Sequence, residues 1–221
     1  LGVISSMAWI PSTDAWWMGM GGNSVCAIRG CVYVRDTVQA SPTFGLYDAL
    51  IEGNGLFAVA GLAVRPSDGS VYTFEADGSD GLFSLDPATG DTATVFDTFD
   101  EGSAGKGTTF GPDGLLYVSG NEDLSVIDVD LQTFNTVGSY TYTGFPTIND
   151  ASPTVGSMAT RESDGTVFAI FKDGGGGGNT TATYLVTINL STAEMTNVGL
   201  NTNLLDGLAY IPTRLVQALQ N

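Results

Sequence analysis

The segment "GLAVRPSDGSVY", residues 61–72, contains the unit from which the whole chain is built. It consists of a small residue, a short apolar run, an Asp-Gly pair and a second apolar run that ends on an aromatic residue. Because Asp-Gly readily adopts the positive φ angles of a tight two-residue turn, the segment predicts a β-hairpin that turns at Asp68-Gly69. The unit recurs as "SMAWIPSTDAWW" (6–17), "GTTFGPDGLLY" (107–117) and "GSMATRESDGTVF" (156–168). The later copies turn at Asp113-Gly114 and Asp164-Gly165, whereas the first has Asp14-Ala15.

A second hairpin follows each copy of this unit. In "GLFSLDPATGDTATVF" (81–96), Pro87 suits a type I turn and Gly90 suits the left-handed position after it. The counterparts are "SVCAIRGCVYV" (24–34), "LSVIDVDLQTFNTVGSY" (124–140) and "TYLVTINLSTAEMTNVG" (183–199). Each copy of the repeat therefore predicts a four-stranded antiparallel meander.

The period of the repeat predicts the architecture. One small residue of the unit appears as Ala8, Ala63, Thr109, Ala159 and Ala209, spaced 55, 46, 50 and 50 residues apart. Four strands in such a period are typical of β-propeller blades. Strands that are apolar at successive positions, such as "GLAV", agree with blades buried on both faces. The alternative, a β-sandwich of separate hairpins, does not explain the period.

We therefore expect an all-β propeller of about four blades, forming one domain over residues 1–213. The predicted blades cover residues 5–36, 61–99, 107–143 and 156–200. The pattern "GLAVRPSDGSVY…GLFSLDPATGDTATV" resembles the secreted bacterial and archaeal propeller repeats of the YVTN, NHL and TolB-like kind. The resemblance extends over residues 5–213, and its motifs imply a fold rather than an activity.

A fifth copy of the innermost strand stands at the end of the chain, as "LDGLAYIPT" (205–213), without further strands behind it. An unpaired apolar strand invites pairing with another chain. We expect it to close the ring in its own chain, to cap an edge, or to complete a blade in a neighbouring subunit. The residues that would make these contacts are Leu205, Gly207, Leu208, Ala209, Tyr210 and Ile211.

Two further segments lie outside the repeat. Residues 37–55 appear as an insertion between the first two blades, predicted to be a surface loop with a helical turn around Tyr47 to Ile51. The C-terminal tail, residues 214–221, has Leu215, Val216, Ala218 and Leu219 on one helical face. It is too short to be an autonomous helix, so we expect it to dock or to fray.

Composition restricts the partners. The chain has 221 residues, no histidine and a formal net charge of −17. This charge repels phosphate backbones and anionic lipid headgroups, which argues against a nucleic-acid or membrane-surface partner. No run approaches the ~18 apolar residues that span a bilayer, so no membrane span is expected. Without histidine, without a nucleophile elbow and without a phosphate-binding loop, no catalytic or cofactor-binding residues are predicted.

Some residue types still suggest ligands or modification. Asp128 and Asp130 lie two apart, on one face of a predicted strand, and are the best candidates for a bound Ca²⁺, although no EF-hand spacing is present. Asn179 and Asn189 begin N-glycosylation acceptor patterns. Trp9, Trp16 and Trp17 fit the packing of the first blade better than a platform that stacks on a glycan.

The hypothesis from the sequence is a non-enzymatic extracellular or cell-surface protein with a structural or adhesive role. Self-association through the terminal strand would build a surface layer or filament. The alternative is a carboxylate- or calcium-dependent hydrolase or lyase that acts on a glycan or lactone in the central depression. Its candidate residues are Asp150, Glu162 and Asp206.

Cys26 and Cys31, the only cysteines, are predicted to form a disulfide across a hairpin that turns at Arg29-Gly30. A disulfide implies an oxidising compartment. We expect a thiol assay on the denatured, unreduced protein to detect no free thiol, and reduction to release two. Two reactive thiols before reduction would contradict the prediction.

Overall fold

The computed structural model describes residues 4–12, 15–20, 32–35, 47–51, 59–75, 81–96, 107–120, 122–146, 148, 154–173, 182–201 and 208. These residues form strands and turns and contain no helix. In this part of the chain, accordingly, there is no helix of the length and hydrophobicity needed to cross a membrane.

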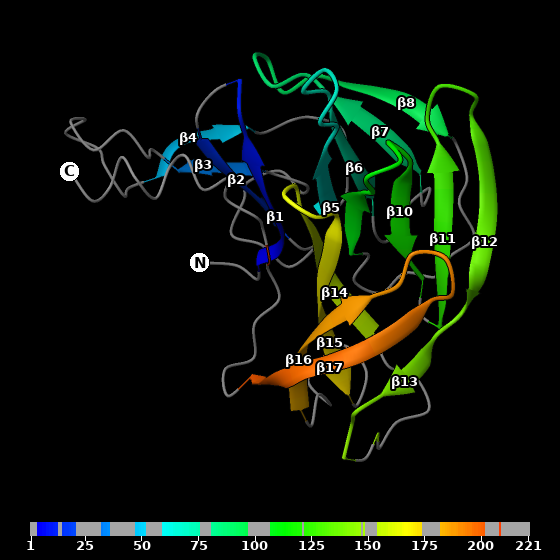
Figure 1. The fold of residues 1–221 in the computed structure, drawn as a ribbon. Helices are drawn as coiled ribbons and strands as arrows, with labels where there is room; N and C mark the ends of the chain where they lie inside the picture. Colours follow the sequence, from blue (N-terminus) through cyan, green and yellow to red (C-terminus); the bar gives the residue numbers. More distant parts are fainter. Residues whose placement is uncertain are drawn as a thin grey trace.

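The strands form four sheets (Figure 1). The first contains β1 (Ile4–Ile10), β2 (Ala15–Met20), β3 (Val32–Arg35) and β4 (Tyr47–Ile51). The second contains β5 (Val59–Val64), β6 (Val71–Glu75), β7 (Leu82–Leu85) and β8 (Thr92–Phe96). The third contains β9 (Thr108–Phe110), β10 (Leu116–Ser119), β11 (Asp123–Asp128) and β12 (Thr133–Ser139). The fourth contains β14 (Thr154–Arg161), β15 (Thr166–Asp173), β16 (Ala182–Ile188) and β17 (Glu194–Asn201), with β13 (Thr141–Thr143) at its edge.

The four sheets are the blades of a propeller. Within each blade consecutive strands are antiparallel, and the first strand lies innermost (Figure 1). The innermost strands contact one another in a closed cycle, β1 with β5, β5 with β9, β9 with β14 and β14 with β1. The predicted all-β propeller with about four blades is thus confirmed.

The core lies between the blades. Trp17 and Ile10 of the first blade are buried against Val59 and Leu62 of the second. A second cluster joins the second and third blades, and a third cluster joins the third and fourth. Because each of these clusters uses side chains from two neighbouring sheets, burial of apolar surface holds blade to blade as well as strand to strand.

The Asp-Gly turns differ in detail from the prediction. Gly69, Gly114 and Gly165 have positive φ angles of 76°, 80° and 73°, but the aspartates before them do not. Each Asp Oδ1 instead accepts a hydrogen bond from the backbone N–H two residues on, at Ser70 (2.9 Å), Leu115 (3.1 Å) and Thr166 (3.0 Å). The prediction of a two-residue turn at each Asp-Gly pair was therefore wrong. The connections are longer, and the aspartate caps the turn while glycine supplies the left-handed residue.

The second hairpins of the second, third and fourth blades follow one scheme, with or without glycine. Gly90 has a φ of 80°, as the Asp-Pro-Ala-Thr-Gly sequence predicted. Gln132 (52°) and Ala193 (58°) take the same left-handed position in the third and fourth blades. Residues with a side chain pay strain there, so the tertiary structure selects this conformation more than the local sequence does.

Two predicted assignments need correction. Tyr47–Ile51 is not a helical turn in a surface insertion, because it pairs antiparallel with β3 as the fourth strand of the first blade. Thr141–Thr143, expected at the end of the third blade, pairs parallel with β17 in the fourth. The chain thus passes from the edge of one blade directly onto the edge of the next (Figure 1).

The terminal copy of the repeat is described at one residue. Leu208 N donates to Ser157 Oγ at 3.0 Å, and the same hydroxyl donates to Leu208 O at 3.1 Å. Ser157 belongs to the innermost strand β14, next to a bulge in its pairing with β15. The other residues of 205–213, the tail 214–221, both cysteines and Asn179 lie outside the described residues.

Gly165→Ala is expected to destabilise the fold by about 1–2 kcal/mol because φ at this position is left-handed. The added Cβ would also lie 3.1 Å from Pro112 of the third blade. Gly199→Ala is the matched control, since its Cβ would meet nothing within 4 Å. Urea unfolding of the two variants should show a loss of stability for Gly165→Ala alone. Equal stabilities would contradict the role given to the turn.

Candidate functional site

A central depression of about 1020 Å³ opens where the four innermost strands end. Every blade contributes to its wall. In each blade the small residue of the repeat and the residue before it both line the depression. The small residues are Ala8, Ala63, Thr109 and Ala159, and the residues before them are Met7, Leu62, Thr108 and Met158. The first hairpin of each blade forms the rim. The depression is therefore a direct product of the repeat, lined by apolar side chains and hydroxyls.

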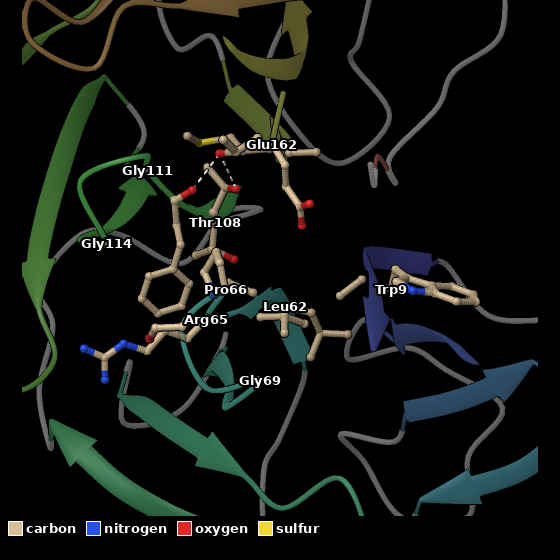
Figure 2. Close-up of a pocket in the computed structure, with 18 of the residues that line it drawn as sticks. Trp9, Leu62, Arg65, Pro66, Gly69, Thr108, Gly111, Gly114 and Glu162 are labelled. Carbon is tan, nitrogen blue, oxygen red and sulfur yellow. Dashed lines mark hydrogen bonds between the residues drawn. The ribbon is translucent and has the colours of Figure 1, made fainter. Parts of the chain in front are cut away.

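Among the described residues that line the depression, Arg65 is the one cation. Its guanidinium binds the Asp130 carboxylate with both terminal nitrogens, with Nη1 to Oδ1 at 2.9 Å. Nη1 also lies 3.6 Å from Asp68 Oδ2. In Figure 2 the side chain is directed away from the open space. Arg65 thus joins the second blade to the third, and the described lining offers no free positive charge.

The described lining contains three carboxylates, and two of them, Asp68 and Asp113, accept hydrogen bonds within their own turns. The Ser70 N–H and the nearby Arg65 hold the pKa of Asp68 below its ordinary value. Asp113 accepts a hydrogen bond from the Tyr117 hydroxyl at 2.8 Å. Burial, together with this bond to Asp113, raises the pKa of Tyr117 well above its ordinary value, so the tyrosine stays neutral.

Glu162 is the third carboxylate. It lies in the β14–β15 turn, is exposed, and forms no hydrogen bond or ion pair with any other described residue. Figure 2 shows its carboxylate reaching over the depression toward Leu62 and the strand that carries Trp9. Of the enzyme candidates from the sequence, only Glu162 is placed here, because Asp150 and Asp206 lie outside the described residues.

Threonine hydroxyls connect the strands beneath the rim. Thr109 Oγ1 and Thr160 Oγ1 are 2.9 Å apart across the junction of the third and fourth blades, and Thr160 Oγ1 donates to Phe110 O at 2.7 Å. Thr108 is 4% exposed, and its hydroxyl has no hydrogen-bond partner in the described structure. A buried hydroxyl without a partner is uncommon and calls for an explanation.

The predicted Ca²⁺ ligands are engaged by protein groups. β11 ends at Asp128, so Asp130 lies in the following turn rather than on the same strand face. Asp128 Oδ1 accepts from the N–H groups of Asp130 and Leu131, both at 3.0 Å, and Asp130 binds Arg65. Within the described ranges, no three His, Cys, Asp or Glu side chains are grouped as a metal site requires.

Other predicted residues are placed as follows. Trp9 and Trp17 are buried, and Trp9 packs edge to face on the half-buried Trp16 with ring centroids 5.4 Å apart, in keeping with a packing role. Asn189 lies in an exposed turn, where its Oδ1 accepts from Ser191 N at 2.9 Å. Its glycosylation stays a prediction.

Comparison with known protein families and with curated proteins finds no match to this sequence. Solved structures share its fold. An auxiliary nutrient binding protein from Bacteroides thetaiotaomicron is 10% identical, with a TM-score of 0.57 over 90% of this chain and 42% of its own. A protein of unknown function from the same species is 12% identical, with a TM-score of 0.57 over 88% and 42%. A chain of a nidogen–laminin complex is 10% identical, with a TM-score of 0.56 over 94% and 84%.

These likenesses concern the fold. The chain spans less than half the length of the two Bacteroides proteins, at 42% of each. With the four radial sheets and their central depression, the comparisons define the protein as a β-propeller. Sequence reasoning found the blades, but it missed the link between Arg65 and Asp130. The repeated small residue was the one signal for the depression, because small side chains at one position of each innermost strand leave room at the axis.

The Arg65–Asp130 pair is expected to stabilise the fold above about pH 4. Arg65 lowers the pKa of Asp130 from its ordinary 3.8, so the contribution is present above 3.8 and is lost as the pH falls through the lower folded value. Asp130→Asn should therefore lower Tm at neutral pH, and the difference from the unaltered protein should vanish in acid.

The control for this experiment is Asp91→Asn, since Asp91 is exposed and its carboxylate accepts a hydrogen bond from the Thr89 hydroxyl. Thermal unfolding followed by circular dichroism over a pH series measures both variants. A Tm difference for Asp130→Asn that persists unchanged into strong acid would contradict the assignment.

Proposed function

We propose that the protein is a non-enzymatic, extracellular structural or adhesive propeller that acts by binding, and that its terminal repeat copy connects neighbouring molecules. The contact between Ser157 and Leu208 carries the proposal. Within one chain, it holds Leu208 of the terminal copy against the innermost strand β14 through two hydrogen bonds to one hydroxyl. Every copy of the chain carries the same donor and acceptor groups, so the two bonds can also form between two chains.

Exchange of this kind would reuse the contact found within one molecule, where Leu208 is bonded to Ser157 of β14. When the terminal copy leaves its own ring and enters that of a neighbour, the same contacts form at the same cost per contact. Because head-to-tail donation need not close on itself, it produces chains of molecules, as a surface layer or filament requires.

The charges around the depression support binding over catalysis. General acid–base chemistry on a glycan uses a pair of carboxylates that are free to exchange protons. Here Asp68 and Asp113 are held in their turns, which leaves Glu162 as the single unengaged carboxylate among the described lining residues. An isolated carboxylate serves as a contact for a ligand.

The extracellular location rests on the sequence. The pair of cysteines is spaced for a disulfide, and the chain contains two lysines against 24 acidic residues. Its charge favours solubility at high ionic strength. The glycosylation pattern at Asn189 lies on an exposed turn, which is where such a modification requires its acceptor.

Deletion of residues 205–221 is expected to abolish self-association, because it removes the exchanged strand. Ser157→Ala should weaken self-association, since Leu208 then loses both hydrogen bonds to the hydroxyl. The matched control is Ser163→Ala, in an exposed turn of the same blade. Analytical ultracentrifugation over a concentration series measures the three variants and the unaltered protein.

A thermal melt of each variant shows that the ring itself still folds. Monomers at every concentration, for the unaltered protein and the deletion alike, would contradict the assembly role. Self-association that Ser157→Ala leaves unchanged would show that a different surface mediates it.

A further inference from the structure

We propose that the central depression binds a basic side chain, lysine or arginine, on an extended segment of a protein partner, with Glu162 as its counter-charge. The inference rests on the proposed function in one respect, that the ring acts by binding. It assigns the ligand class to the depression, whereas self-association concerns the terminal copy and Ser157.

The size of the depression suits a peptide segment. Its volume of about 1020 Å³ lies just above the range of about 300–1,000 Å³ for pockets that hold small organic ligands. A bare cation needs a much smaller space with several converging oxygens. The described residues offer no such cluster. An occupant with both bulk and charge therefore fits better than an ion.

The lining suits the stem of a long basic side chain. Met7, Leu62 and Met158 line the depression at equivalent positions of three blades. Met7 is half-buried, whereas Leu62 and Met158 are each 3% exposed, so Met7 offers the most accessible apolar surface of the three. Lysine and arginine lay their methylene stems along apolar surface while the charged end stays near water or a carboxylate. Methionine adapts its shape to such a stem because its side chain is unbranched and flexible.

The charges select a cation. Glu162 reaches over the depression and has no partner among the described residues (Figure 2). Arg65, the only cation in the described lining, is neutralised by Asp130 and is directed away (Figure 2). Asp68 and Asp113 add negative potential from the neighbouring turns. A carboxylate ligand would meet only like charge here, whereas an ammonium or guanidinium group meets its counter-charge.

The net charge of −17 strengthens the same preference at long range. A field of this size steers basic partners toward the surface and raises their rate of association. It also means that weak, non-specific attraction of any cation is expected. The test must therefore separate a local contact with Glu162 from the field of the whole molecule.

The experiment uses short blocked peptides with the full chain. One peptide carries a single central lysine between glycine and serine residues, and its counterpart carries norleucine, which keeps the stem and lacks the ammonium group. Binding is followed by NMR titration. We expect the lysine peptide to bind about fivefold more tightly than the norleucine peptide, with shifts at Met7, Leu62 and Met158.

Two charge-matched variants locate the contact. Glu162→Gln should weaken the lysine peptide about fivefold and leave the norleucine peptide unchanged. Glu122→Gln removes the same charge from an exposed position before β11, at the opposite end of β10 from the rim, and should have little effect. Glu162→Lys should abolish the preference for lysine. Thermal melts confirm that each variant folds.

Equal affinity for the lysine and norleucine peptides would overturn the proposal. So would equal losses in Glu162→Gln and Glu122→Gln, which would assign binding to the overall field. If the protein is monomeric but prefers the lysine peptide, the ligand proposed for the depression is supported and the assembly role is refuted. If the protein self-associates without preferring the lysine peptide, the assembly role is supported and the proposed ligand is refuted.

Discussion

The crowding of four innermost strands around one axis is the constraint on which the rest of the structure depends. Each of these strands must approach its neighbours on both sides, so bulky side chains are excluded from the positions nearest the axis. Ala8, Ala63, Thr109 and Ala159 meet this requirement and are all at least nine-tenths buried. Gly107 meets it more strictly, because a Cβ there would lie 2.8 Å from Met158 Cγ and 2.9 Å from Val155 Cγ1. The same small residues leave the central depression open.

Many of the acidic residues that the structure describes have a structural role in the turns. Asp68, Asp86, Asp113, Asp128 and Asp164 each accept a hydrogen bond from a backbone N–H near their own turn. These hydrogen bonds cap the hairpin turns, and for Asp68 and Asp164 the pKa is held below its ordinary value. A chain built from such turns acquires negative charge with every blade. The field that favours basic partners is therefore a consequence of the repeat.

The sequence was sufficient for features that local pattern determines. Asp-Gly marked three turns, and Asp-Pro-Ala-Thr-Gly placed Gly90 in the left-handed conformation that the structure shows. The prediction failed where a distant strand decides the outcome. "YDALI", residues 47–51, suits a helical turn by its own preferences, yet the open edge of β3 recruits it as a strand. Thr141–Thr143 likewise pairs with β17, which lies about fifty residues further along the chain.

The candidate site also divides into features that local sequence predicts and features that it does not. A repeated small residue indicates space at the axis, but no residue near Arg65 in the sequence predicts its contact with Asp130, which is 65 residues away. The contact forms because the first hairpin turn of the second blade lies beside the second hairpin turn of the third blade. The local sequence also does not predict that Glu162 lacks a partner among the described residues. Glu162 occupies a turn whose capping Asp164 already engages Arg161 through Nε at 2.9 Å, so the glutamate is left without a partner among the described residues.

The alternation of β14 joins the two proposed roles. Ser157 and Met158 are neighbours on this strand, so their side chains point to opposite faces. Ser157 holds Leu208, whereas Met158 lines the depression. Leu208 is itself the counterpart, in the terminal copy, of Met7, Leu62, Thr108 and Met158. Exchange of the terminal copy between molecules would therefore change what lies beside Ser157 without altering the face that Met158 presents. A propeller of this design can be connected to its neighbours while its central depression stays available for a ligand.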